Sequence, residues 1–566
     1  MSLTSMNKSL HLMMRMLDPK EPTEPMISLP PKPEIPAIQK STSLPRHTPE
    51  RHGISSRHIA AFLQTLEQDP TLNMHSIMIL RDGCVLCEAS FGAQDIRIPR
   101  MTFSACKSIV SLAVGILMDD GVLRPETQLT ELFPEAGNAI SRRLMKDLTV
   151  EELLSMRSGA QFNEIACMTQ EDWLSGFFSP GLSGGRFQYN SLNTYILSRI
   201  VCQLSGRSLS DFLSERLFGP MGIRDFYWEV CPNGTEKGGW GLYLRAEDLG
   251  KLGQLVLDGG LWEGHQLISR EYLEKATQIH AKVPMHYGDY DYGWQFWVGR
   301  KDDIVLMNGM LGQNVLCFRE NGITVVSHAG NEETFQQSNY FRHAAAFFAR
   351  AFDPGLPRDA VGIRGLRKTL HALVLPQAKL PTQADFARFF GRRFVTDAPK
   401  APSTGSLPLT LQAVQNCYTK GVQAIAIGGS RETVEIFYEE RDTLHHILAG
   451  TRAPHIQSME FGGNVFRVAA YARFTHDEDE TPVLRVQLDF LETPFSRILK
   501  LYLTPSGMTL RQEETPCMDK ILETVLSDAY PAVKTLIGTV FGTGDLDFLR
   551  WRMSVVFAPE LEFTEE

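Results

Sequence analysis

The sequence predicts an α+β fold in two parts: a larger domain built around one antiparallel sheet, and a smaller C-terminal α+β domain. Strand-like segments at 75–81 and 84–91 open the first part, helical patterns fill its middle, and strand-like segments return over 293–328. That order is typical of a protein whose terminal segments share one antiparallel sheet. A second series of short strands begins after residue 386, which predicts a separate domain.

Length and composition are those of a globular chain with a large core. At 566 residues the chain is long enough for two or three domains. Its hydrophobic content of 43% and charged content of 22% are ordinary for a globular protein. The formal net charge is -10 and no Lys/Arg-rich stripe occurs, which argues against nucleic acid and anionic membranes as partners.

Residues 1–54 are predicted to form an extended N-terminal arm. The segment 18–50 is rich in Pro, Ser, Thr and Lys, a composition that cannot build a core. Ordered structure is predicted from residue 55, because residues 57–63 open a helical pattern. The domain that starts there, 55–353, has strands at both ends and helices between them.

The rest of the chain is predicted to be a linker followed by a second domain. Residues 354–385 contain several Pro and Gly residues, which is typical of a linker. Over 386–566 the pattern consists of short strands, with helices near 517–527 and 530–539, and no catalytic motif is recognisable there. The sequence therefore predicts a smaller α+β domain of unknown role.

The sequence predicts neither a membrane span nor a metal or cofactor site. It contains no apolar run of about 18 residues and no signal peptide. Nine cysteines make no dense disulfide framework, and the close pair Cys84 and Cys87 lacks the second pair that a zinc ribbon requires. His445 and His446 have no partners in the pattern either. We therefore expect a cytoplasmic protein without cofactor or metal, and its oligomeric state stays open.

A Ser-x-x-Lys motif is the candidate reactive site. Ser104 opens a predicted helix that runs to Asp120, and Lys107 follows three positions later. Residues three apart share one face of a helix, so the serine Oγ and the lysine Nζ can meet. A neutral lysine can take the hydroxyl proton, and burial beside a helix N-terminus lowers its pKa. Alone, the tetrapeptide is weak evidence, because it often arises by chance.

Four sequence blocks extend this observation: 103–123, which contains the Ser-x-x-Lys motif, 148–159, 187–198 and 245–262. Together they resemble the serine β-lactamase and penicillin-binding-protein superfamily, in particular its class C-like branch of esterases, amidases and peptidases. They agree with that branch in order and spacing over about residues 55–350. The resemblance implies a β-lactamase/transpeptidase-like domain, in which helices flank an antiparallel sheet.

The resemblance also implies roles for two residues that precede a predicted helix. Tyr189 would be the second catalytic residue, since a phenol held near Lys107 can relay a proton to or from the reacting groups. Ser191 would either hydrogen-bond the substrate or orient Lys107.

Two segments compete for the third motif of the superfamily. His328 begins a His-x-Gly sequence, but it follows a strand that comes too late in the chain. Asn308, Gly309 and Met310 begin a block that resembles the His-Gly-x-x-Gly-Gln block of 6-aminohexanoate-oligomer hydrolases, with Asn308 where His is usual. We favour the second, because order and spacing outweigh a short letter match.

This choice also assigns the remaining site residues. The backbone N–H groups of Ser104 and Met310 would form the oxyanion hole, while Asn308 and Gly309 would contact the substrate.

The sequence thus predicts a serine hydrolase that cleaves an ester or amide bond through an acyl-Ser104 intermediate. Its substrate would be a small ester or amide or a short peptide, whose identity depends on the loops that line the cleft. Two alternatives stay open. One is a D-amino-acid peptidase or carboxypeptidase, and the other is a catalytically retired binding protein with the same fold.

Overall fold

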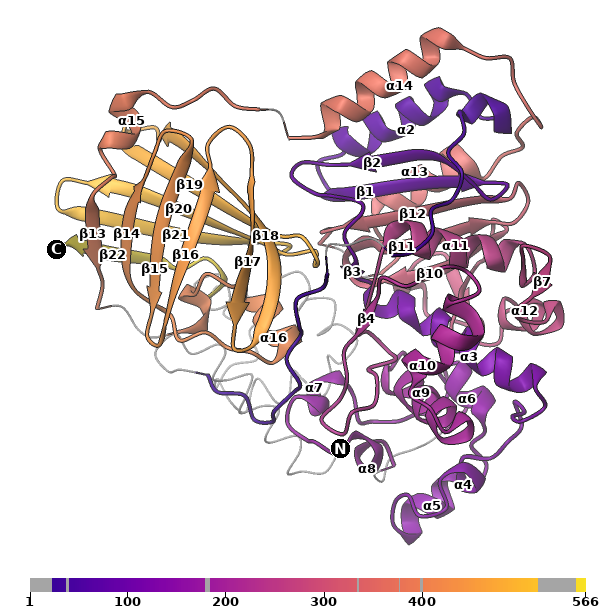
Figure 1. The fold of residues 1–566 in the computed structure, drawn as a ribbon. Coiled ribbons are helices and arrows are strands. Elements are labelled where there is room, and N and C mark those ends of the chain that lie inside the picture. Colours follow the sequence, from indigo (N-terminus) through magenta and orange to yellow (C-terminus); the bar gives the residue numbers. More distant parts are fainter. Residues whose placement is uncertain are drawn as a thin grey trace.

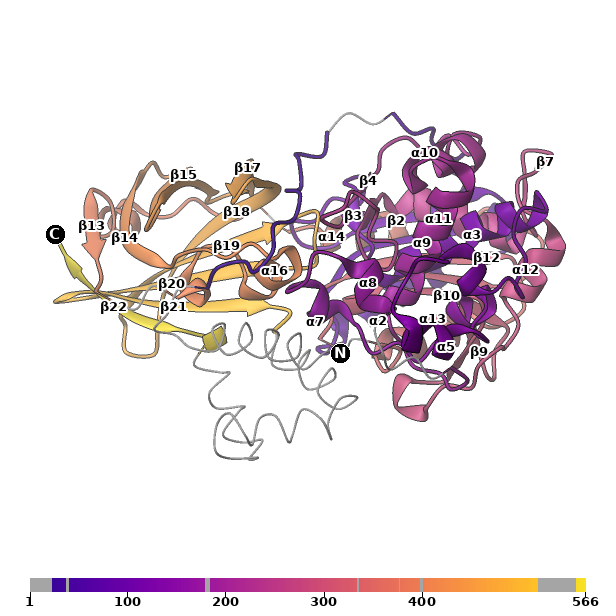
Figure 2. The same ribbon diagram turned by 90° about the horizontal axis from the view of Figure 1, so that it is seen from below.

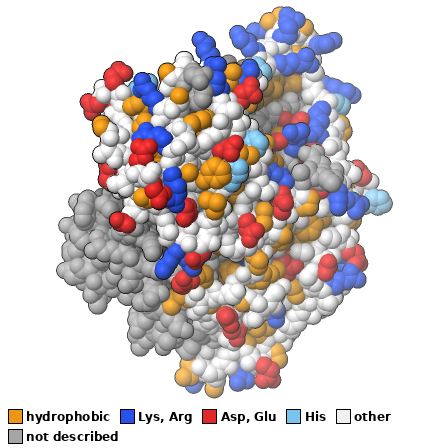
Figure 3. Space-filling view, turned by 60° about the vertical axis from the view of Figure 1, so that its left-hand side comes forward, with side chains coloured by type: hydrophobic (Ala, Val, Ile, Leu, Met, Phe, Trp, Pro, Cys, Tyr) orange, Lys and Arg blue, Asp and Glu red, His pale blue; other side chains and the backbone are white. Residues whose placement is uncertain are grey.

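The chain folds into a helix-rich body and a body of long strands, which lie side by side (Figures 1 and 2). The computed structural model describes residues 23–36, 40–178, 184–332, 335–375, 377–397, 401–517 and 556–566. On the face drawn in Figure 3, acidic and basic side chains are interspersed. Among the described residues, no helix is both long and apolar enough to cross a bilayer.

The helix-rich body is built around a seven-stranded sheet in the order β2-β1-β12-β11-β10-β9-β8. The strands are β1 (Met74–Arg81), β2 (Cys84–Ser90), β8 (Tyr290–Tyr292), β9 (Trp297–Gly299), β10 (Ile304–Gly309), β11 (Gln313–Phe318) and β12 (Ile323–Ala329). The first strand pairs antiparallel with the last one, with Ile77 opposite Ser327. The predicted α+β fold with a shared antiparallel sheet is confirmed.

Helices cover both faces of this sheet, which explains why β1 is buried along nearly its whole length. Ile77 and Ile79 pack in a cluster with α2 (Ser56–Gln68), α13 (Asn339–Phe348) and α14 (Ala360–Leu373). Met78 and Leu80 point the other way, into a cluster with α3 (Cys106–Asp119), α9 (Leu192–Ser205) and α11 (Ala246–Leu257). The helix α14 lies within the segment predicted as a linker and packs on α2.

Shorter elements complete the helix-rich body. The helices are α4 (Leu129–Leu132), α5 (Ala139–Met145), α6 (Val150–Leu154), α7 (Glu164–Cys167), α8 (Trp173–Phe177), α10 (Leu209–Leu213) and α12 (Arg270–Ala276). Two small sheets are formed by β3 (Arg100–Met101), β4 (Tyr227–Trp228) and β5 (Leu242–Leu244), and by β6 (Leu261–Trp262) with β7 (His265–Gln266).

The second body is a barrel-like sheet of ten strands in the order β16-β15-β14-β13-β22-β21-β20-β19-β18-β17. The strands are β13 (Arg392–Val395), β14 (Val422–Gly429), β15 (Thr433–Glu440), β16 (Thr443–Gly450), β17 (His455–Phe461), β18 (Asn464–His476), β19 (Pro482–Phe490), β20 (Ser496–Thr504), β21 (Gly507–Thr515) and β22 (Glu560–Glu565). A parallel bridge from Gly450 to Tyr471 joins β16 to β18 and curls the sheet toward closure. The short helix α15 (Gln383–Ala387) precedes its first strand, and α16 (Leu409–Gln415) lies between β13 and β14.

The sequence pattern predicted strands here but not the closure of the sheet. Burial alternates along β15, as expected when one face of a sheet lines a core. The helices predicted near 517–527 and 530–539 fall on 518–555, outside the described residues.

The N-terminal arm passes along both bodies (Figure 2). In the barrel-like body, Lys32 Nζ forms a fully buried ion pair of 2.8 Å with Glu492. Farther along, Arg46 forms a parallel bridge with Val85, so the arm adds pairing to the edge strand β2. Covering an edge in this way protects its free backbone groups from pairing with other chains.

The two bodies share an apolar cluster directly behind the segment that carries Ser104. Met101 and Phe103 pack in the same cluster as the interior of the barrel-like sheet. The Phe103 ring meets Phe495 edge to face, with ring centroids 6.4 Å apart. The Met101 N–H donates to the Glu492 carbonyl at 2.9 Å. The loop between β19 and β20 therefore supports this segment.

Candidate active site

Ser104 lies in a tight turn that leads into α3. The turn is a 3-10 helix, Phe103–Ala105, and α3 continues it from Cys106. Phe103 has φ +46°, a conformation that is uncommon outside glycine. Within residues 101–110 every side chain is buried except that of Ser104, which is partly exposed. The turn thus presents one hydroxyl group to the outside of a closely packed segment.

Lys107 lies on the first turn of α3 with its amino group directed at this hydroxyl. Its Nζ is 2.7 Å from Ser104 Oγ, 2.9 Å from Ser191 Oγ and 2.6 Å from the Gly239 carbonyl oxygen. Burial lowers the pKa of Lys107 from 10.5 to about 8. The Gly239 carbonyl oxygen can only accept a hydrogen bond, so it orients one N–H of Lys107 toward itself. The lone pair of the neutral Lys107 amine is then able to take the proton of Ser104.

Tyr189 closes the other side of the site, just before α9. The Lys107 Nζ lies 5.0 Å from the centroid of its ring. Burial raises the pKa of Tyr189, and a hydrogen bond with the Ser104 side chain partly offsets that increase. The ring stacks on Trp297 at 5.7 Å and meets Phe335 edge to face at 5.6 Å. The phenol therefore stays protonated at neutral pH.

Ser191, which contacts Lys107 directly, is itself held in place by Glu164. The Ser191 N–H donates to Glu164 Oε1 at 3.0 Å, which holds the start of α9 against α7. The negative charge of Glu164 acts against the burial effect and raises the pKa of Lys107.

Sequence reasoning missed both Glu164 and the Gly239 carbonyl. Glu164 reads only as an acidic residue in the first turn of a short helix, after the cap Asn163. At Gly239 an added Cβ would overlap the backbone and side chain of Ser191, so a close approach explains the glycine. Neither feature is evident without the tertiary contact.

Asn308, Gly309 and Met310 lie where β10 ends, beside the Ser104 turn. A Cβ on Gly309 would overlap the Thr102 carbonyl oxygen, so the two backbones touch here. Asn308 is 5% exposed, donates to Asn314 Oδ1 at 2.6 Å, and accepts from Gln336 Nε2 at 3.0 Å. Its amide is therefore held by neighbouring side chains.

His328, the competing residue, lies on β12, where it pairs across to Ser76 of β1. It is completely buried, and burial together with Arg100 holds its pKa well below the usual value. Its Nδ1 is 3.0 Å from Gln313 Oε1, and Gln313 Nε2 donates to the Leu311 carbonyl at 3.2 Å. His328 is therefore linked to the turn after β10 through Gln313.

The fold and this arrangement together define a hydrolase of the active-site serine type. Residues 74–346 match the family model described as Beta-lactamase. Together with the similarity to a known hydrolase given below, this match shows a serine hydrolase related to β-lactamases.

The chain is similar to a curated relative and to several solved structures. The chain is 26% identical over 286 residues to the 6-aminohexanoate-dimer hydrolase of Paenarthrobacter ureafaciens, which covers 44% of this chain and 70% of the relative. A penicillin-binding protein homologue from Caulobacter crescentus superposes with a TM-score of 0.43 and 16% identity, covering 55% of this chain and 100% of that one. A family VIII carboxylesterase gives a TM-score of 0.41 and 14% identity, covering 56% and 96%.

Proposed function

We propose that the chain hydrolyses linear esters or amides through an acyl-Ser104 intermediate, with Lys107 as base and Tyr189 as proton relay. The observation that carries this proposal is the 2.7 Å contact between Lys107 Nζ and Ser104 Oγ. A second supporting observation is the pKa of Lys107 of about 8, because part of this lysine is then neutral and able to act as a base near physiological pH.

In the acylation step, Ser104 Oγ attacks the substrate carbonyl carbon while its proton passes to the neutral Lys107 amine. The backbone N–H groups of Ser104 and Met310 receive the developing oxyanion, and two such donors lower the barrier by several kcal/mol. Collapse of the tetrahedral intermediate breaks the bond to the leaving group. Tyr189 transfers the proton from Lys107 to that leaving group.

In the deacylation step, the neutral Lys107 takes a proton from an attacking water, through Tyr189 or directly. The hydroxide adds to the acyl carbon, and the bond to Ser104 Oγ breaks. Lys107 then returns the proton to Ser104, so the enzyme is restored with no net change.

We propose a chain-like acyl group without a carboxylate for the substrate. The half-buried ring of Phe335 meets Tyr189 edge to face and gives this side of the site an apolar surface, which favours apolar chains. Asn308 supplies no positive charge, so a substrate carboxylate would lack an ion pair at that position. The relative that hydrolyses a 6-aminohexanoate dimer supports a linear amide as the substrate class.

The test is a panel of p-nitrophenyl esters, linear amides, and short peptides ending in L- or D-residues. We expect wild type to hydrolyse members of the panel and Ser104→Ala to lose at least about 10³-fold in kcat/KM. Fluorophosphonate labelling followed by mass spectrometry should place the adduct on Ser104. An adduct on another residue, or full activity in Ser104→Ala, would refute the proposal.

The same panel tests the alternatives. A preference for D-residue peptides would favour a cell-wall-type peptidase, and no turnover or labelling at all would favour a retired binding protein. The cytoplasmic location stays a prediction, and fractionation of cells that produce the protein tests it.

A further inference from the structure

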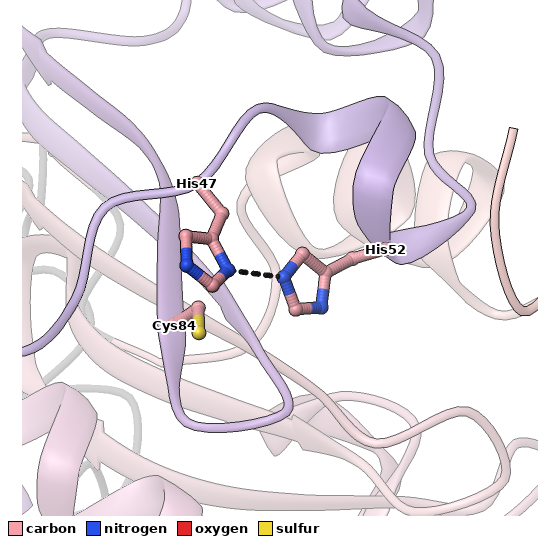
Figure 4. Close-up of side chains that lie close together, drawn as sticks. All are labelled: His47, His52 and Cys84. Carbon is pink, nitrogen blue, oxygen red and sulfur yellow. Dashed lines mark hydrogen bonds between the residues drawn. The ribbon is translucent and has the colours of Figure 1, made fainter. Parts of the chain in front are cut away.

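A second group of reactive side chains lies at the edge of the large sheet, where the arm meets β2. His47 belongs to the arm, His52 ends the short 3-10 helix Pro49–His52, and Cys84 is the first residue of β2 (Figure 4). The His47 N–H donates to the Val85 carbonyl at 3.0 Å, so the backbone fixes the arm at this point. Three segments thus converge through side chains that are all good metal ligands.

The geometry of the three side chains fits a metal ion. One ligand atom from each of His47, His52 and Cys84 lies within 4.8 Å of the other two, and Figure 4 shows the two rings facing each other with the Cys84 side chain beside them. His47 Nδ1 and His52 Nε2 are 2.9 Å apart. Around a tetrahedral zinc ion, with zinc–ligand bonds of about 2.0–2.3 Å, any two of the three ligand atoms would be roughly 3.3–3.6 Å apart. Small ring rotations bring the observed positions to that spacing.

A neighbouring carboxylate orients the His52 ring so that its free nitrogen can bind a metal. Asp82 lies in the turn between β1 and β2, and its Oδ2 accepts from His52 Nδ1 at 2.8 Å. That bond leaves the lone pair of His52 on Nε2, the atom that faces His47. A carboxylate behind a histidine is the usual second layer of a metal site, and it fixes both ring orientation and basicity.

We propose that His47, His52 and Cys84 bind a zinc ion, which fastens the N-terminal arm to the edge of the sheet. Two imidazoles and a thiolate suit zinc better than hard cations such as magnesium or calcium. Binding releases the Cys84 thiol proton to solvent, and His47 carries its remaining proton on Nε2. The fourth position would be filled by water. This proposal is independent of the hydrolase mechanism.

The competing interpretation is a chain of hydrogen bonds that needs no metal. Arg51 lies 3.3 Å from His47 Nε2, and a donor there would leave the His47 proton on Nδ1, facing His52. The chain would then continue from His52 to Asp82. The Cys84 sulfur takes no part in that chain of hydrogen bonds, whereas it would be a ligand of a bound metal. Evidence that the sulfur binds a metal therefore distinguishes the metal site from the hydrogen-bond chain.

Titration of the chelator-stripped full-length protein with Co²⁺ and with Zn²⁺ tests the proposal. We expect stoichiometric Co²⁺ binding with a thiolate-to-cobalt charge-transfer band in the near ultraviolet, and displacement of the cobalt by Zn²⁺. Zn²⁺ should also slow proteolytic cleavage of the arm. Failure of wild type to bind stoichiometrically, or binding without a thiolate band, would overturn the proposal without recourse to any variant.

Variants locate the site. Cys84→Ser should abolish the thiolate band, and Asp82→Asn should weaken Zn²⁺ binding by about 10- to 100-fold, as loss of a second-layer partner does elsewhere. Cys87→Ser is the matched control, because Cys87 is also buried on β2 but lies outside the cluster. Retention of the band in Cys84→Ser, or its loss only in Cys87→Ser, would place the metal elsewhere. Hydrolase activity of each variant reports whether it has folded.

Discussion

The proposed role of Lys107 makes a quantitative prediction for the pH dependence of hydrolysis. With a pKa of about 8, roughly a tenth of this lysine is neutral at about pH 7, half at about pH 8 and nine tenths at about pH 9. A neutral base is required for attack by Ser104, so kcat/KM should rise about tenfold between about pH 7 and 9 and then level off. A lysine at its ordinary pKa would still be rising steeply at about pH 9.

The assay is the initial rate of p-nitrophenyl ester hydrolysis at substrate concentrations well below KM, with the Ser104→Ala rate subtracted at each pH. Lys107→Met should lose both the activity and the inflection. A flat profile, a falling one, or a rise that continues beyond about pH 10 would refute the assignment of Lys107 as a base with a lowered pKa.

The same shift predicts a change in stability with pH. The unfolded lysine keeps its proton up to a pKa near 10.5, whereas the folded one releases it near 8, so the unfolded state binds more protons between these values. The contribution of Lys107 to the free energy of unfolding therefore increases as pH rises through that interval, by about 3 kcal/mol in total. Comparison of urea unfolding for wild type and Lys107→Met isolates this contribution.

Further predictions follow from the site and from the junction between the bodies, with a surface ion pair as control. Tyr189→Phe should lower kcat/KM by about 10²-fold or more, and combining it with Lys107→Met should cost far less than the product of the two effects; multiplicative losses would mean that the residues act separately. Wild type should hydrolyse nitrocefin poorly compared with its best ester, and Asn308→Lys should acylate penicillins faster if Asn308 lies in the third motif; nitrocefin rates that rival the ester in wild type would contradict this. Glu492→Gln should destabilise the protein by about 3–5 kcal/mol in urea unfolding, because it leaves Lys32 buried without its counter-charge. Asp359→Asn, at a surface ion pair, should cost much less, and equal losses in the two variants would refute the reasoning.

The parts of the structure that follow from local pattern could be predicted from the sequence. The spacing of Ser104 and Lys107 predicted that their side chains can meet, and the contact is present. The order of strands and helices along the chain predicted that β1 and β12 would meet in one sheet, which the structure confirms.

The parts that depend on distant contacts could not be predicted. The Gly239 carbonyl reaches Lys107 across 132 positions of the chain, and no local pattern marks a backbone oxygen. The bridge from Gly450 to Tyr471 that curls the barrel-like sheet depends on sheet twist rather than on residue type. The cluster of His47, His52 and Cys84 brings together the arm, a 3-10 helix and a strand, so a search for paired cysteines could not find it.

The apolar cluster shared behind Phe103 has a consequence for how this hydrolase can be produced and altered. A fragment that ended before the barrel-like body would expose Met101, Phe103, Tyr243 and Leu311 as one apolar patch, which promotes aggregation. It would also remove the Phe495 ring and the Glu492 carbonyl that hold the turn preceding Ser104. Substitutions in the loop between β19 and β20 should therefore change turnover without touching the cleft, which makes this loop a second target for engineering the rate.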